Sequence, residues 1–248
     1  MKITRHENAI FGLRPIMEAI IAGQEIDTLF IQKGLKGDIF PELWELVKTH
    51  RVNYKHVPVE KLNRLTRKNH QGVFAFISPI NFHRTEHIIP QLYEEGKTPL
   101  FLILDRVTDV RNFGAIVRSA ECSGVHAIIV PERGSAAING DAMKTSAGAL
   151  NSMPICREFN LKATIEFLKN SGIQIIACTE KSNEMIYLPN YQLPTAIILG
   201  SEEDGISEEY LKLCTYKTKI PMQGTIGSLN VSVSAGVILY EAVRQRQQ

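Results

Sequence analysis

Cysteine motifs are missing from this 248-residue sequence. Its four cysteines, Cys122, Cys156, Cys178 and Cys214, lie far apart, and no C-x-x-C pair occurs. This spacing argues against a zinc ribbon and against a thioredoxin-type redox pair. Reduced, mostly buried thiols are typical of cytoplasmic proteins, so we expect a cytoplasmic location.

Long apolar runs are missing as well. No stretch approaches the roughly 20 apolar residues that a membrane-spanning helix needs. The N-terminal segment, MKITRHENAIFG, lacks the apolar core of a signal peptide. We therefore expect no membrane partner.

Two common glycine motifs are also absent. Without any G-x-G, the chain lacks the dinucleotide-binding loop of Rossmann folds, and methyltransferases that hold their cofactor on such a loop are disfavoured. Without a G-x-S-x-G elbow, a serine hydrolase is disfavoured too. The segment HRTEH, residues 83–87, matches a zinc signature, but so short a match between prolines is weak. We expect no metal.

The sequence has no large excess of positive or of negative charge. Lysine and arginine number 28 against 26 aspartate and glutamate, which gives a net charge of +2. Any contact with nucleic acid must therefore come from a local patch. The segment 51–68 is a candidate, although its pattern also fits a solvated helix face. Its cations are Arg51, Lys55, Lys61, Arg64, Arg67 and Lys68.

What the sequence does contain is a regular alternation of helix and strand signals. The first 78 residues predict a small α/β unit with helices over 8–23, 38–50 and 58–68 and strands over 26–31, 53–57 and 72–77. Residues 79–98 are punctuated by prolines and predict a connector that contains a short helix.

A second α/β series follows from residue 99. Short apolar strands are predicted over 100–104, 127–130, 173–178 and 195–200. Helices are predicted over 111–124, 138–150 and 163–172, and again from residue 230. Apolar strands that alternate with helices indicate a mostly parallel sheet covered by helices on both faces.

Polar residues follow the first of these strands. Asn112, Gly114 and Arg118 mark a strand-to-helix turn, and open α/β sheets bind ligands at the carboxyl ends of their strands. Arg118 follows Asn112 by about a turn and a half of helix, so both side chains could face one site. A helix-capping asparagine and a surface arginine would explain the same pattern.

A second stretch, residues 196–207, runs from an apolar strand into Gly200, Ser201, Glu202 and Gly205. Glycine here would permit a close approach of the backbone to a ligand or a positive φ. The simpler interpretation is a β–α turn with Ser207 as the cap of the next helix.

The third stretch, residues 220–236, has the same form. It runs from Ile220–Met222 through Gly224 and Gly227 to Ser228 and Asn230, where an apolar helix is predicted to begin. Serine and asparagine favour helix starts because their side chains accept hydrogen bonds from unpaired backbone N–H groups.

Together these stretches resemble the SpoU family of RNA ribose 2′-O-methyltransferases, within the trefoil-knot (SPOUT) class. Members show N-x-G-x-x-x-R after the first strand of the catalytic domain, matched here by Asn112, Gly114 and Arg118. They show G-S-E-x-x-G, matched by residues 200–205, and I-P-M followed by S-L-N-V, matched by 220–222 and 228–231. Three motifs in the right order are far more specific than one. Val110 and Glu203 depart from the family's usual proline and glycine.

The resemblance covers nearly the whole chain. GLRPIMEAI and NHQGVFAF resemble the family's substrate-binding domain, which is related to a ribosomal-protein fold. The family resemblance implies an RNA substrate-binding domain over 1–78, a linker over 79–98 and a knotted methyltransferase domain over 99–248. The members it resembles most methylate a guanosine ribose in large-subunit ribosomal RNA. The same reaction on transfer RNA, or a non-catalytic role in RNA binding or ribosome assembly, remains as an alternative.

The resemblance also implies the roles of individual residues. S-adenosylmethionine would be the methyl donor, bound by Gly200, Ile220, Leu229, Thr179 and Met222. The catalytic residues would be Arg118, Asn112, Glu202, Ser228 and Asn230. Arg118 would act as a base or stabilise charge. A homodimer would form through the apolar terminal segment, residues 230–243.

Overall fold

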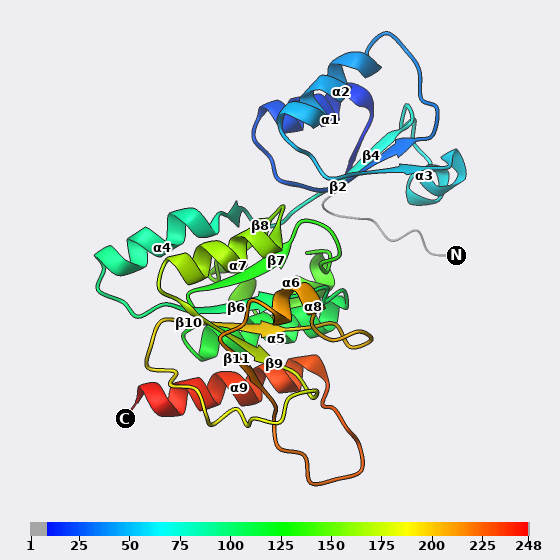
Figure 1. Cartoon of the computed structure of the whole chain (residues 1–248). Helices are drawn as coiled ribbons and strands as arrows, with labels where there is room; N and C mark the ends of the chain where they lie inside the picture. The colour runs from blue at the N-terminus through cyan, green and yellow to red at the C-terminus, as the bar shows by residue number, and fades with distance from the viewer. Residues whose placement is uncertain (1–8, 248) are drawn as a thin grey trace. The chain divides into compact units, whose positions relative to one another are not determined.

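A computed structural model describes residues 9–247 of the chain. The chain divides into two compact units, Met1–Asn81 and Phe82–Gln248 (Figure 1). Residues 1–8, which include the start of the predicted first helix and most of the segment that lacks a signal core, lie outside the described residues. Within residues 9–247, no helix combines the length and apolar character needed to cross a membrane.

The first unit is a four-stranded sheet with helices on both faces. The strands β1 (Ala9–Phe11), β2 (Ile26–Gln32), β3 (Tyr54–Val57) and β4 (Val73–Ile77) lie in the order β1-β4-β2-β3. Side chains alternate between faces along a strand. Leu29 and Ile31 therefore pack with helices α1 (Leu13–Ile21) and α2 (Phe40–Thr49), whereas Phe30 packs with Leu62 of α3 (Val59–Leu65).

The helix predicted over 8–23 is wrong in its first part. Residues Ala9–Phe11 form β1, which pairs antiparallel with β4, and α1 begins only at Leu13. Gly12 separates the two elements with a φ of 92°, a conformation that favours glycine. A run of only three apolar residues, such as Ala9–Phe11, fits a helix face and a strand equally well, so hydrophobic periodicity does not distinguish the two structures here.

The second unit contains a seven-stranded sheet. Its strands are β5 (Phe82–His83), β6 (Leu100–Leu104), β7 (Ala127–Pro131), β8 (Ile155–Glu158), β9 (Gln174–Cys178), β10 (Thr195–Leu199) and β11 (Tyr216–Thr218). Its helices are α4 (Thr85–Glu94), α5 (Val110–Cys122), α6 (Gly140–Thr145), α7 (Leu161–Asn170), α8 (Glu208–Leu211) and α9 (Val231–Arg246).

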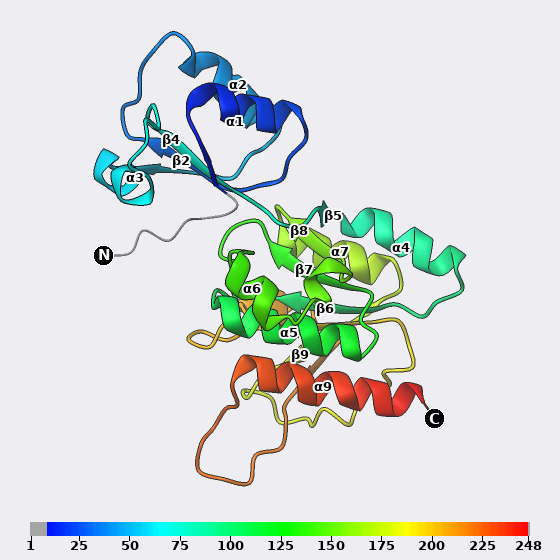
Figure 2. The ribbon, with the colours of Figure 1, turned by 180° about the vertical axis from the view of Figure 1, so that it is seen from behind.

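The strand order is β11-β9-β10-β6-β7-β8-β5, and neighbouring strands pair in parallel throughout. Helices α4, α7 and α8 bury their apolar faces on one side of the sheet. Helices α5 and α9 pack together on the other side, with α6 against α5 (Figure 2). The predicted parallel sheet with helices on both faces is confirmed. The trefoil knot stays a prediction.

Most of the predicted connector, 79–98, is folded into this second unit. β5 pairs with β8, and α4 buries Ile89 and Leu92 against the sheet core. Pro90 lies inside α4. The spacing of Ile89 and Leu92 places both on one helix face, which explains why the segment packs despite its prolines.

Candidate active site

The site forms where the strand order reverses. From β6 the chain moves outward through β7 and β8, and it later returns so that β10 lies directly beside β6. Open α/β sheets bind ligands outside the carboxyl ends of the strands at such a switch point. The sequence after β6 leads to Asn112, and the sequence after β10 leads to Glu202.

Three of the predicted catalytic residues meet at this point. Glu202 Oε1 accepts hydrogen bonds from Asn112 Nδ2 at 2.8 Å and from Asn230 Nδ2 at 2.9 Å. Asn230 Nδ2 also donates to Asn112 Oδ1 at 3.1 Å. The three residues come from the starts of α5 and α9 and from the loop after β10.

Helix capping explains why the two asparagines are held in place. Asp109 caps α5, because its Oδ1 accepts a hydrogen bond from the backbone N–H of Asn112 at 2.7 Å. Asn230 itself caps α9, because its Oδ1 accepts from the backbone N–H of Ser232 at 2.9 Å. Asn230 therefore starts the helix with one side-chain atom and binds Glu202 with the other.

Arg118 does not join this cluster within the chain. It follows Asn112 by six positions on α5, which places it roughly 9 Å further along the axis and about a third of a turn around the helix. Its side chain is exposed and makes no hydrogen bond or ion pair with any residue of the described range. That Arg118 and Asn112 face one site stays a prediction.

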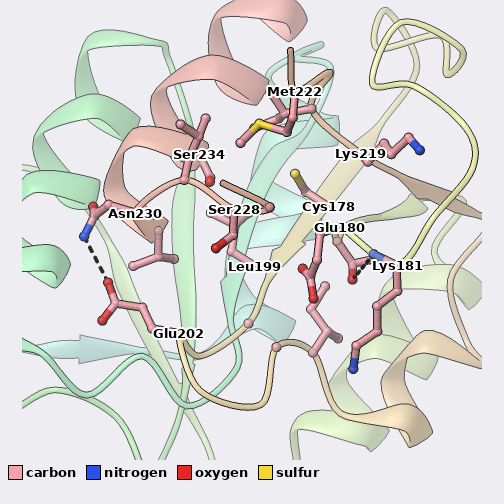
Figure 3. Close-up of a pocket in the computed structure, with 18 of the residues that line it drawn as sticks. Cys178, Glu180, Lys181, Leu199, Glu202, Lys219, Met222, Ser228, Asn230 and Ser234 are labelled. Atoms are coloured by element: carbon pink, nitrogen blue, oxygen red, sulfur yellow. Dashed lines mark hydrogen bonds between the residues drawn. The ribbon is translucent and has the colours of Figure 1, made fainter. Parts of the chain in front are cut away.

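A cleft of about 840 Å³ lies beside the cluster (Figure 3). Its walls include every residue predicted to hold the cofactor, namely Thr179, Gly200, Ile220, Met222 and Leu229. They also include three of the predicted catalytic residues, Glu202, Ser228 and Asn230. Asn112 borders a smaller adjoining pocket, which shares residues 201–204 and Val231 with the cleft. Ser228 makes no hydrogen bond in the described part of the chain.

Gly200 must be a glycine for a packing reason. A Cβ at this position would collide with the backbone of Gly205 and the amide nitrogen of Ile206. Gly205 closes the loop with a φ of 71°, and Ser201 and Gly205 exchange backbone hydrogen bonds of 3.2 and 3.0 Å. The two glycines thus form a tight turn that carries Glu202 at its tip.

Several cleft residues were missed from the sequence. Cys178 is the last residue of β9, Glu180 and Lys181 follow that strand, and Lys219 follows β11. Their position at or directly after the ends of strands of the parallel sheet was the available signal. Burial raises the pKa of the Cys178 thiol to about 12, so this thiol is neutral and unreactive at physiological pH.

No metal site is found within residues 9–247. The described range contains no group of three or more His, Cys, Asp or Glu side chains that could hold a metal ion. In the HRTEH segment, His87 Nε2 lies 3.9 Å from Glu86 Oε1, and both side chains are well exposed.

The cations of the segment 51–68 are exposed in the first unit, whereas Val57 and Leu62 of the same segment are buried. Lys61 Nζ lies 4.8 Å from the ring centre of Phe30, and Lys68 Nζ lies 5.8 Å from that of Phe11. These lysines therefore extend over aromatic rings rather than over carboxylates. Such cations are available to a polyanion.

The fold and the site define an α/β domain with a ligand cleft at its switch point. Residues 99–240 match the sequence pattern of the SpoU rRNA Methylase family, and residues 9–83 match that of RNA 2′-O ribose methyltransferase substrate binding. The first match spans more than half of the chain, so this chain belongs to the SpoU rRNA Methylase family. The resemblance read from its motifs is confirmed.

Individual relatives agree with this assignment. A TrmH family tRNA/rRNA methyltransferase of Staphylococcus saprophyticus is 35% identical over 241 residues, covering 97% of this chain and 96% of the relative. The crystal structure of the SpoU methyltransferase AviRb from Streptomyces viridochromogenes with AdoMet is similar, with a TM-score of 0.61, 28% identity and coverage of 96% and 90%. The TrmH/SpoU tRNA modifying enzyme of A. aeolicus has a TM-score of 0.56 at 32% identity, with coverage of 65% and 84%.

Proposed function

We propose that this protein transfers a methyl group from S-adenosylmethionine to a ribose 2′-hydroxyl of RNA. The Glu202 carboxylate, held by Asn112 and Asn230 beside the cleft, is the observation that carries the proposal. Membership of the SpoU rRNA Methylase family supports the reaction, and the AdoMet complex of AviRb supports the cofactor.

The cleft fits S-adenosylmethionine in size and in the chemistry of its walls. A volume of about 840 Å³ lies within the range of small-molecule sites. Gly200, Ile220 and Leu229 would offer backbone groups and apolar contacts to the adenosine, while Thr179 and Met222 complete the wall. Carboxylates such as Glu180 suit a positively charged sulfonium. When bound, the cofactor supplies an electrophilic methyl carbon.

A ribose 2′-hydroxyl is a poor nucleophile, so the protein must orient it and give its proton a route. Glu202 Oε1 is held by the two asparagines, whereas Oε2 accepts no hydrogen bond within residues 9–247. Oε2 is thus free to accept a hydrogen bond from the ribose. Ser228 lines the same cleft and offers a further hydroxyl. Orientation of this kind contributes at most about 7–11 kcal/mol.

Arg118 has a different role in this proposal. A guanidinium stays protonated in proteins, so Arg118 is not a general base. Its planar fork would bind an RNA phosphate and stabilise negative charge that develops on the 2′-oxygen. The proton would leave through phosphate or water. The absence of any ion pair to Arg118 in the described range leaves it available for this contact.

We propose ribosomal RNA as the substrate, with a guanosine of the large subunit as the expected target, in the cytoplasm. The match of residues 9–83 to a substrate-binding domain supports a large RNA. Transfer RNA is the second candidate, because the Staphylococcus relative is named for both RNAs and the A. aeolicus relative for tRNA.

We propose that the protein works as a homodimer. Helix α9 carries a stripe of exposed apolar side chains, Val233, Val237 and Tyr240, at helical spacing. A contiguous exposed apolar stripe is a common sign of a protein–protein interface. A second copy would cover this stripe close to the start of α9, where Asn230 lies.

The deciding experiment is a map of methylated riboses in RNA from cells with and without the protein. One position that loses its methyl group identifies the RNA and the nucleotide. Calorimetry with S-adenosylmethionine supplies the second test, since a non-catalytic RNA-binding protein would bind none. An unchanged methylation map together with no cofactor binding would overturn the proposal.

A further inference from the structure

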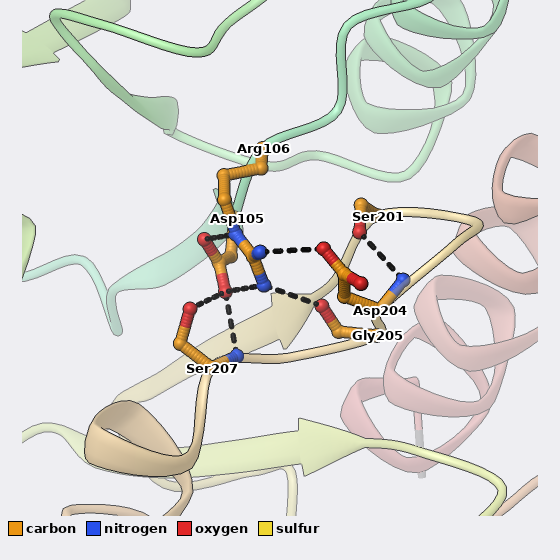
Figure 4. Close-up of polar contacts among 6 residues, drawn as sticks. All are labelled: Asp105, Arg106, Ser201, Asp204, Gly205 and Ser207. Atoms are coloured by element: carbon orange, nitrogen blue, oxygen red, sulfur yellow. Dashed lines mark hydrogen bonds and ion pairs between the residues drawn. The ribbon is translucent and has the colours of Figure 1, made fainter.

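One charged cluster beside the cleft has no part in the mechanism above. It joins the end of β6 to the loop after β10 and consists of Asp105, Arg106, Ser201, Asp204, Gly205 and Ser207 (Figure 4). The loop that it holds, residues 201–205, carries Glu202 at its tip and lines the cleft.

Asp105 anchors one end of this loop. Its side chain is only 2% exposed, and its Oδ2 accepts hydrogen bonds from both the backbone N–H and the hydroxyl of Ser207, each at 2.7 Å. Ser207 is the first residue before α8, yet its side chain makes no capping bond there. The predicted capping role is thus replaced by the bond to Asp105.

Arg106 bridges from Asp105 to the closing end of the loop. Its Nε donates to Asp105 Oδ1 at 3.0 Å, while its two terminal nitrogens reach Asp204 Oδ2 at 2.9 Å and the Gly205 carbonyl at 3.2 Å. Asp204 in turn donates its backbone N–H to Ser201 Oγ at 3.1 Å. A single guanidinium therefore ties the end of β6 to Asp204 and Gly205, which lie 98 and 99 positions later in the sequence.

Two further observations indicate that this bridge serves the site rather than overall stability. Arg106 has a φ of 59°, an unfavourable conformation for a residue with a Cβ, and strained backbone of this kind gathers at functional sites. Its pair with Asp204 is exposed on both sides, 38% for Arg106 and 68% for Asp204, and such ion pairs contribute little to folding. The hydrogen bond to Asp105 raises the pKa of Arg106, so the bridge stays charged.

We propose that Arg106 is a positioning residue, which with Asp105 locks the loop 201–205 so that Glu202 meets Asn112 and Asn230 and the cleft wall is formed in advance. The expected loss of methyl transfer rests on the proposed function. The expected ordering of the loop 201–205 by Arg106 does not, because it concerns the protein without any ligand.

The test compares Arg106→Asn with Arg84→Asn. Asparagine tolerates a positive φ, so Arg106→Asn removes the guanidinium without adding backbone strain. Arg84 is the matched control: its guanidinium also bonds a carbonyl, that of Arg157 at 3.0 Å, and a carboxylate, that of Glu158 at 3.5 Å, at the far edge of the same sheet. Unfolding temperatures of the two variants should be alike.

Arg106→Asn should lower kcat for methyl transfer about 10- to 100-fold and weaken cofactor binding, with KM for RNA little changed, because a small misplacement of a catalytic group is enough. Arg106→Lys should recover part of the loss, since one ammonium can bond either Asp204 or Gly205 but not reproduce the fork. The double variant with Asp204→Asn and Arg106→Asn should have the same kcat as Arg106→Asn alone, as expected for two residues that act through one interaction.

Amide hydrogen exchange of residues 201–205 in the protein without ligand provides a readout that needs no activity. Exchange should be faster in Arg106→Asn and unchanged in Arg84→Asn. Unchanged exchange, or kcat and cofactor affinity within about twofold of the parent, would overturn the positioning role. If exchange rises in Arg106→Asn but the parent protein methylates no RNA, the proposed function is wrong, whereas the positioning of the loop 201–205 by Arg106 is supported.

Discussion

Asn230 and Glu202 lie 28 positions apart, and their side chains are joined by a 2.9 Å hydrogen bond at the carboxyl edge of the parallel sheet. The same carboxylate oxygen accepts a bond from Asn112, 90 positions earlier in the chain. The loop after β10 and the starts of two helices are thereby fixed to one atom. The second carboxylate oxygen, Oε2, accepts no hydrogen bond within residues 9–247 and is the oxygen that we propose binds the ribose.

Glu202→Gln tests this arrangement. The amide keeps the shape of the side chain, and its oxygen can still accept the hydrogen bonds from Asn112 and Asn230. The second oxygen becomes an NH2 group, which donates and so cannot accept the hydrogen bond proposed for the ribose. We expect methyl transfer to fall about 100-fold. Glu203→Gln is the matched control, because Glu203 is the exposed neighbour in the same loop and makes no hydrogen bond within residues 9–247. Equal rates for the two variants would contradict the assignment.

Arg118→Ala should abolish turnover and leave cofactor affinity nearly intact, because the exposed Arg118 side chain lies outside the cleft. Arg118→Lys should also be poor, since an ammonium lacks the planar fork that binds phosphate. Calorimetry and single-turnover methylation measure the two quantities. Lys162→Ala, an exposed cation on α7, serves as the control for charge loss. A near-normal rate in either Arg118 variant would remove the residue from the mechanism.

The dimer proposal is tested by two substitutions in α9. Val237 is 37% exposed, whereas Leu239 is fully buried. Val237→Glu should give a folded monomer with weak activity. Leu239→Glu should unfold the chain, because losing a buried leucine costs about 2–5 kcal/mol before the buried charge is counted. Light scattering and thermal unfolding separate the outcomes. A stable parent monomer with full methyl transfer would show that the dimer is not required.

Thiol alkylation should be selective. Burial raises the pKa of Cys156 and Cys178 to about 12 and that of Cys214 to about 11. A raised thiol pKa lowers the thiolate fraction, so these three react slowly with iodoacetamide up to about pH 9. The exposed Cys122 should be labelled first. Peptide mass spectrometry measures the order. Rapid labelling of Cys178 in the folded protein would show that this part of the cleft opens.

The sequence was a good guide to the layers of the second unit. Consecutive parallel strands need a crossover, so apolar runs alternating with helical segments predict a covered parallel sheet. The same logic places Gly200 and Glu202 at a strand end. It fails for short elements such as β1 and β11, whose three residues each carry too little periodicity to identify a strand.

Other features depend on contacts between residues that are far apart in the sequence, and hydrophobic periodicity does not predict such contacts. The spacing of Asn112 and Arg118 predicts one shared site, but Arg118 makes no hydrogen bond or ion pair with any residue of the described range, so this stays a prediction. The role of Arg106 depends on Asp204 and Gly205, 98 and 99 positions away. Helix α9 is apolar around much of its circumference, so only the packing of α5 against it distinguishes exposed Val237 from buried Leu239.

The position of Asn230 at the start of the last helix has a consequence for protein synthesis. Domains fold as the chain emerges, N-terminal parts first. Asn112 and Glu202 are made before their common partner, and α9 must also be complete to pack against α5. A nascent chain therefore holds no finished site until Asn230 and the helix α9 have been made and have folded against α5. We expect a chain that stops anywhere before residue 230 to lack methyl transfer.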